Sequence, residues 1–162
     1  MIDTAHLHPM IVHFPIALLI TGFFFDIVGL FVTRESFTTT GFYLLILGSL
    51  GVVAAFISGS IAGGSISEGG MLGKALETHE DAADLTIWIV SITAIVRILL
   101  VVLKRYSGYL KAIGLILYLA SVLAIARTGY YGGKLVYEHA AGVQLNLGNE
   151  FGTPMNEETG KD

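Results

Sequence analysis

Apolar residues fill four long segments of the chain, and short polar stretches separate them. The segments run over residues 10–32, 41–63, 82–103 and 111–131, approximately. A helix that crosses about 30 Å of hydrocarbon at 1.5 Å per residue needs roughly 20 apolar residues. Each segment meets that requirement, so the pattern predicts four transmembrane helices.

The connections between these segments predict an up-down bundle. Residues 33–36 and 104–109 are short polar links, which favour antiparallel hairpins on either side of them. Residues 64–81 form a longer link rich in Gly and Ser. The predicted fold is therefore all-α: an integral membrane four-helix bundle in residues 1–143, followed by a polar surface tail in residues 144–162.

Basic residues are denser in the two short links than at the other side of the predicted bundle. Those in or beside the short links are Arg34, Lys104, Arg105 and Lys111. Short cytoplasmic loops carry an excess of Lys and Arg. We therefore expect both termini on the outer, periplasmic side.

Composition supports a membrane protein and excludes several other classes. The chain is 54 % hydrophobic and 14 % charged, whereas a soluble domain carries about a quarter of its residues as charged ones. The lipid bilayer is thus the expected environment. The absence of a basic tract argues against a nucleic-acid partner. The absence of cysteine excludes disulfides, iron–sulfur clusters held by thiolates and covalently attached haem c.

Two opposite charges are predicted to meet inside the membrane. Asp26 and Arg97 lie at matching depths of the first and third segments, roughly 23 Å below the outer surface. An isolated charge at the centre of a bilayer costs about 2.5–3.5 kcal/mol on insertion scales. We therefore predict an ion pair between them, and we favour a structural role over a proton relay.

All five histidines are expected at the outer face, because an even number of crossings brings them there. They are His6, His8, His13, His79 and His139. Pro9 and Pro15 bracket His13 at the start of the first segment, with Pro9 suited to a first helical turn. This arrangement predicts that His13 lies just inside the edge of the bilayer.

Glycines mark the second and fourth segments. In the second, small residues recur every three or four positions, at Gly48, Gly51, Ala55, Gly59 and Gly63. This stripe favours close helix contact over a groove for a flat cofactor. In the fourth, Gly129, Gly132 and Gly133 are expected to end or bend the helix, with Lys134–Val143 following as a short interfacial helix.

Two motifs carry a resemblance to a known family. The opening LHPMIVHFPIALL (Leu7–Leu19) and the later TGYYGGKLVYEHAAGV (Thr128–Val143) resemble the bacterial membrane proteins grouped as domain of unknown function 2231. The resemblance spans nearly the whole chain and includes Asp26, His79 and Arg97. It implies a four-helix fold in the bacterial inner membrane, a matching set of histidines, and an association with respiratory or other electron-transfer systems. The family pattern favours Gly where Ala140 or Ala141 stands.

The leading functional hypothesis is a small membrane subunit that binds b-type haem near the periplasmic face for electron transfer. Haem b requires axial imidazoles from facing helices, an apolar slot, and cationic or hydroxyl partners for its propionates. The expected axial ligands are His13 and His79, with His139 as a further candidate. The expected propionate partners are Arg127 and Tyr130 or Tyr131, although Arg127 also has the option of snorkelling to water.

Two alternatives belong to other classes. A cofactor-free accessory or assembly subunit of a larger membrane complex fits the small size and the glycine stripe. A metal-handling protein is the other, since imidazoles and carboxylates near the outer face suit zinc, copper or iron. Its candidate ligands are His6, His8, His13, Glu77, His79, Glu80, Asp81 and His139. We rank it lower because the sequence indicates no polar stripe through the helices. We do not predict an enzyme, because the sequence shows no recognisable set of catalytic residues.

Overall fold

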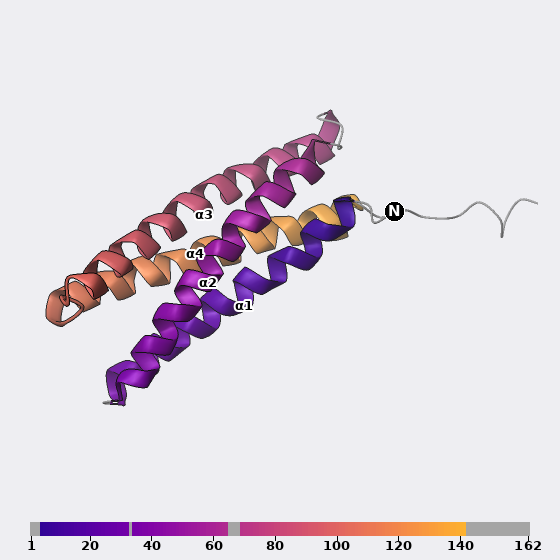
Figure 1. Cartoon of the computed structure of the whole chain (residues 1–162). Helices are drawn as coiled ribbons and strands as arrows, with labels where there is room; N and C mark the ends of the chain where they lie inside the picture. Colours follow the sequence, from indigo (N-terminus) through magenta and orange to yellow (C-terminus); the bar gives the residue numbers. More distant parts are fainter. Residues whose placement is uncertain (1–3, 33, 65–68, 142–162) are drawn as a thin grey trace, which may run out of the picture.

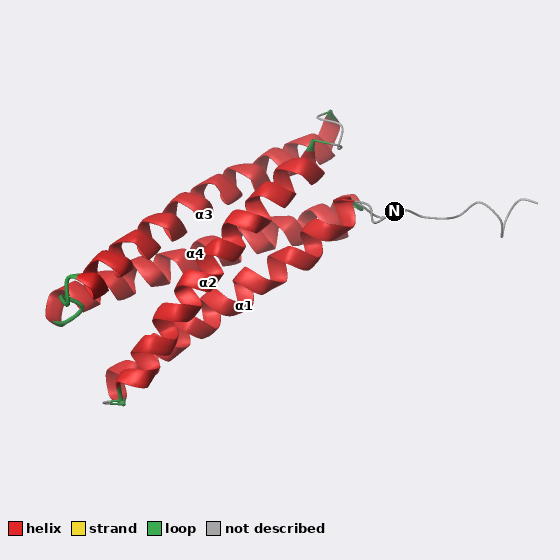
Figure 2. Cartoon of the chain, viewed as in Figure 1, coloured by secondary structure: helices red, strands yellow, loops and turns green. Residues whose placement is uncertain are grey.

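In the computed structural model, four long helices lie side by side (Figure 1). The structure describes residues 4–32, 34–64 and 69–141, with side chains from Leu7 onward in the first helix, so the predicted tail at 144–162 lies outside the described residues. Within those ranges the chain contains helices and turns without a strand (Figure 2). The helices are α1 (Thr4–Phe31), α2 (Glu35–Gly63), α3 (Gly70–Val102) and α4 (Gly108–His139).

Every helix contains an apolar stretch that is long enough to cross a membrane. The predicted four-helix membrane bundle is therefore confirmed. α1 packs mainly against α2 and α3 mainly against α4, so the bundle consists of two hairpins. Smaller contacts of α2 with α3 and of α1 with α4 join the hairpins, whereas the backbones of α1 and α3 do not come into contact. α1 and α3 run in the same direction and lie diagonally opposite each other (Figure 1).

The helices are longer than the apolar segments predicted. Residues 70–81, which we expected to form a link, are the first turns of α3. α4 continues through its glycines to His139, so the separate interfacial helix predicted from Lys134 onward is wrong. At 33 residues, α3 is about 50 Å long, which exceeds the thickness of hydrocarbon. Its polar first turns therefore extend beyond the membrane, where hydropathy gives no signal for a helix.

We name the two ends of the bundle by what lies there. The loop end contains the α1–α2 and α3–α4 connections. The histidine end contains the starts of α1 and α3 and the ends of α2 and α4 (Figure 1). Between the two ends lies an apolar core formed by Leu19, Leu45, Val52, Val90, Tyr118 and Ile125.

Glycines of α2 bring its backbone against α1. A Cβ atom at Gly48 would lie 2.9 Å from Leu19, and one at Gly51 would lie 3.1 Å from Pro15. Pro15 and Pro9 both lie inside α1, because the helix begins at Thr4 and not near Pro9 as we expected. The glycine stripe thus serves close helix contact along much of its length.

Hydroxyl groups join α3 to α4 within the bundle. The side chains of Thr86 and Thr128 lie 2.9 Å apart, and the Ser121 hydroxyl donates to the Thr93 hydroxyl at 2.9 Å. These hydroxyl pairs are polar contacts inside an interface that is otherwise apolar. Ser and Thr also bond to carbonyls of their own helix, so they interrupt an apolar segment very little.

Candidate functional site

Two histidine side chains meet across the bundle at its histidine end. His8 of α1 and His79 of α3 have ring centroids 6.4 Å apart, with an angle of 73° between the ring planes. Both side chains are half-buried. The backbones of α1 and α3 do not come into contact, so the two imidazoles bridge the diagonal through their side chains.

The hydrogen bonds of both rings place the proton on Nδ1. His79 Nδ1 lies 3.2 Å from the carbonyl oxygen of Thr128, which can only accept a hydrogen bond. His8 Nδ1 lies 3.0 Å from Ser58 Oγ, and that hydroxyl donates its own proton to the Ala55 carbonyl. Ser58 Oγ is therefore the acceptor for His8. In both rings these hydrogen bonds leave the lone pair of Nε2 available.

Glycines of the other two helices lie against the edges of these rings. A Cβ atom at Gly59 of α2 would be 2.9 Å from His8 Cε1, and one at Gly132 of α4 would be 3.1 Å from His79 Cε1. A larger residue at position 59 would displace the imidazole. Next along α4, a Cβ at Gly133 would meet nothing within 4 Å. Glycine backbone of α2 therefore lies beside His8, and glycine backbone of α4 lies beside His79.

The predicted intramembrane pair is present toward the loop end. Arg97 Nη2 lies 2.9 Å from Asp26 Oδ1, and both side chains are at most 2 % exposed. Arg97 Nη2 also donates to the carbonyl of Thr38 at 3.4 Å. The ring of Tyr106 covers the guanidinium, with 3.4 Å between Arg97 Cζ and the ring centroid. Tyr106 is thus turned into the bundle, whereas an aromatic residue at a span end would ordinarily face the membrane interface.

The same spacing along the chain produces both diagonal contacts. His8 and Asp26 are 18 residues apart in α1, and His79 and Arg97 are 18 residues apart in α3. Eighteen residues make about five helical turns, so each pair lies on one face of its helix, about 27 Å apart along the axis. This equal spacing is the signal in the sequence that points to His8 as the partner of His79.

His13, which we predicted as an axial ligand, does not meet His79. Its side chain is exposed, and Nδ1 contacts the carbonyl of Pro9 in the same helix. Thirteen residues separate His13 from Asp26, which turns His13 about 140° away from the buried face of α1. The structure thus brings His8 to His79 in the place where the sequence predicted His13.

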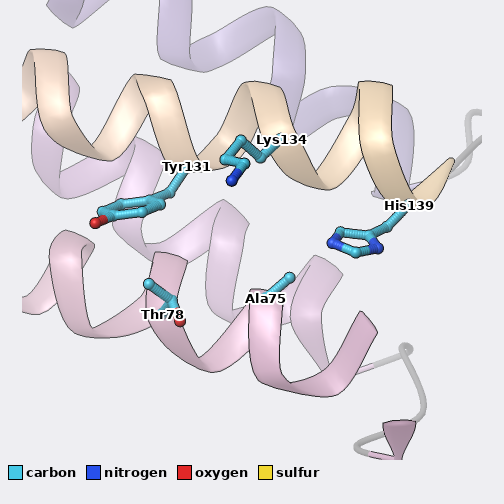
Figure 3. A pocket seen from close by; sticks show the side chains of 5 residues that line it. All are labelled: Ala75, Thr78, Tyr131, Lys134 and His139. Atoms are coloured by element: carbon cyan, nitrogen blue, oxygen red, sulfur yellow. The ribbon is translucent and has the colours of Figure 1, made fainter. Parts of the chain in front are cut away.

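The other predicted site residues lie on the outside of α3 and α4. His139 lines a small hollow of about 110 Å³ between these helices, together with Ala75, Thr78, Tyr131 and Lys134 (Figure 3). Sites for molecules of cofactor size are typically about 300–1,000 Å³. Arg127 and Tyr130 are exposed, and the Arg127 guanidinium lies 5.2 Å from the ring centroid of Tyr131. These residues are therefore not gathered around His8 and His79.

Among the residues whose side chains are described, no group of three or more His, Asp and Glu residues is positioned to hold a metal ion. The side chain of His6, one of the candidate ligands, lies outside the described residues. The described arrangement therefore offers a pair of imidazoles and not the larger ligand set of the metal-handling hypothesis.

Comparison with known protein families gives a match over most of the chain. Residues 4–145 match the model of a family described as "Predicted membrane protein (DUF2231)". The matched region contains both diagonal contacts, and it confirms the resemblance that the two end motifs indicated. No curated protein and no solved structure matches the chain.

Proposed function

The chain belongs to the DUF2231 family of predicted membrane proteins, and we propose that it is an electron-transfer subunit in which His8 and His79 hold one b-type haem. One observation carries this proposal. Two imidazoles from different helices lie with their ring centroids 6.4 Å apart, each with its Nδ1 proton engaged and its Nε2 lone pair available. Neutral imidazole with a fixed tautomer is the form that ligates a metal.

The distance between the rings suits a shared iron. A metal–imidazole bond of about 2.0 Å, with each ring centre about 1 Å beyond its nitrogen, separates two axial rings by about 6 Å. The centroids of His8 and His79 are 6.4 Å apart. This similarity of distances supports axial ligation of one iron by the pair.

The number of ligands favours haem over a bare metal ion. A porphyrin supplies four nitrogens to its iron, so two protein imidazoles complete the coordination. A zinc site instead takes three or four protein ligands. When bound, haem would supply one-electron transfer. The chain's own contribution is to orient the two rings through the Ser58 hydroxyl and the Thr128 carbonyl.

The glycines beside the rings support the seating of the two axial imidazoles. Gly59 and Gly132 leave room for the rings against the backbones of α2 and α4, and a Cβ at Gly133 would meet nothing within 4 Å. We therefore interpret the histidine end of the small-residue stripe as the surface that holds the ligand side chains. The density of basic residues at the loop end favours a periplasmic position for this site, in the inner membrane of a bacterium.

Absorption spectra of the purified full-length protein test the proposal. After incubation with haem, oxidised and reduced samples are expected to show the Soret and visible bands of a six-coordinate b-type haem. His8→Ala and His79→Ala should each remove these bands, whereas the matched variant His13→Ala should keep them. Gel filtration and circular dichroism establish that each variant is folded.

Two results would overturn this assignment. Loss of the bands in His13→Ala, with retention in His8→Ala, would restore the ligand pair predicted from the sequence. A wild-type protein that stays colourless after haem addition, while copurifying with fixed membrane partners, would instead favour the cofactor-free accessory role.

A further inference from the structure

A second polar site surrounds the Asp26–Arg97 ion pair. Several buried side-chain atoms there have no hydrogen-bond partner among the described residues. They are Asp26 Oδ2, Arg97 Nε, Arg97 Nη1, the Tyr106 hydroxyl and the Tyr118 hydroxyl. Asp26, Arg97 and Tyr118 are each at most 1 % exposed. Buried polar groups nearly always have a partner, from the protein or from ordered water.

The neighbouring glycines accommodate these polar ends. A Cβ atom at Gly41 of α2 would lie 2.8 Å from Asp26 Oδ1. A Cβ atom at Gly22 of α1 would collide with the hydroxyl of Tyr118. Two helices therefore lack side chains at the positions where the carboxylate and the hydroxyl project. Polar groups therefore occupy the space that apolar side chains would otherwise fill in the interior.

The unpartnered atoms are complementary to water. Asp26 Oδ2 accepts hydrogen bonds, the two guanidinium nitrogens donate them, and each tyrosine hydroxyl does both. A buried water molecule typically makes about three hydrogen bonds to groups of this kind. We propose that Asp26, Arg97 and Tyr118 bind internal water, and that this water exchanges with solvent at the loop end, past Tyr106.

The position of the buried polar atoms favours the loop end as the place where the internal water exchanges with solvent. Arg97 is seven residues from Lys104 in the α3–α4 connection, a distance of about 10 Å along the helix. Tyr106, which is half-buried in that connection, separates the guanidinium from the exterior. In the other direction the core residues Leu19, Val90 and Ile125 fill the bundle. Internal water at this place gives solvent protons access to Asp26 from the loop end, while the apolar core separates the site from the histidine pair.

Arginine-selective ¹⁵N labelling tests the water site in the wild-type full chain. The protein has four arginines, namely Arg34, Arg97, Arg105 and Arg127. Arg→Lys replacement of the three exposed ones assigns their Nε–H signals, so Arg97 follows by elimination. We expect a cross-peak between Arg97 Nε–H and water, and exchange in D₂O at least tenfold faster than that of core amides such as Val90, which are measured on a uniformly ¹⁵N-labelled sample. An Nε–H that shows no water cross-peak and persists as long as those amides would refute internal water.

Variants of the tyrosines test which groups bind the internal water and where this water exchanges with solvent. Tyr118→Phe removes one hydroxyl without opening the core, and it should slow exchange of Arg97 Nε–H several-fold, whereas Tyr130→Phe should not. Tyr106→Ala uncovers the guanidinium and should accelerate the exchange at least tenfold. Tyr109→Ala is the control, because Tyr109 is exposed at the same end. An unchanged rate in Tyr106→Ala would exclude the loop-end route. These measurements do not depend on bound haem, so they stand or fall separately from the proposed function.

Discussion

Removing the charge of Asp26 is expected to destabilise the protein strongly. Asp26→Asn leaves Arg97 as a buried cation that is 1 % exposed and has no other anionic partner within salt-bridge distance among the described residues. Breaking a buried ion pair by removing one partner costs about 3–5 kcal/mol. The carbonyl of Thr38, 3.4 Å from Nη2, is a weak substitute for the carboxylate. A loss of about 3 kcal/mol shifts the unfolding equilibrium by more than 100-fold.

Reversible unfolding in mixed micelles with increasing SDS measures this loss. Asp26→Asn and Arg97→Met should each lower the midpoint strongly, whereas the double variant Asp26→Leu/Arg97→Met should recover most of the stability, because apolar residues need no partner. The control is Glu138→Gln, which removes the exposed ion pair between Lys134 and Glu138 (3.4 Å). Such surface pairs contribute at most about 0.5 kcal/mol. If Asp26→Asn unfolds at the wild-type midpoint, the reasoning that Arg97 needs this anion is wrong.

Three further substitutions have defined outcomes. Ser58→Ala removes the acceptor of His8 Nδ1–H, so it should destabilise the fold by about 1 kcal/mol in the same assay and weaken haem retention in a dilution experiment. Gly59→Val places methyl groups against the His8 ring and should abolish the haem bands while circular dichroism stays unchanged; retained bands would contradict the role of Gly59 in seating that ring. Ala140→Gly relieves a left-handed residue (φ 51°) at the end of α4 and should raise stability by about 1 kcal/mol.

The substitution Ala140→Gly concerns a position where the family resemblance and the backbone conformation both bear on the choice of residue. Ala140 is the left-handed residue that follows α4, and its backbone N–H bonds to the carbonyl of Leu135. Glycine adopts this conformation without a steric penalty. The resemblance left Ala140 and Ala141 as alternatives for a favoured glycine, and the left-handed backbone gives a physical reason to prefer Ala140.

Hydropathy predicted the four spans because it reports where a chain tolerates hydrocarbon. It did not predict the full lengths of the helices, because residues 70–81 and the last turns of α4 are polar or glycine-containing and gain their helical structure from packing. Gly132 illustrates this: inside a helix it costs about 1 kcal/mol relative to alanine, yet here it lies against His79. The contact depends on register between two helices, which no local pattern encodes.

Depth along the helix was enough to predict the Asp26–Arg97 pair, but it was not enough to choose among the histidines. His8 and His13 lie near the same membrane face, and the flanking prolines favoured His13. The angular position around α1 instead favours His8, since of these two histidines only His8 lies on the same face of the helix as Asp26. A buried charge therefore identifies the inner face of its helix, and counting whole turns from it selects the histidine. The acceptors of the two Nδ1 protons involve α2 and α4, so they required the structure.

The two diagonal contacts depend on each other through the geometry of the hairpins. The α1–α2 and α3–α4 hairpins are internally well packed but share much less contact with one another, so side chains that cross the diagonal add to the contacts that set their relative register. The ion pair holds α1 and α3 in register at the loop end, and the equal 18-residue spacing carries that register to His8 and His79. A slide of α3 by a single residue would shift His79 by about 1.5 Å, which is most of an iron–nitrogen bond length. The buried charges, about 27 Å from the imidazoles, therefore contribute to the geometry of the proposed haem site without touching it.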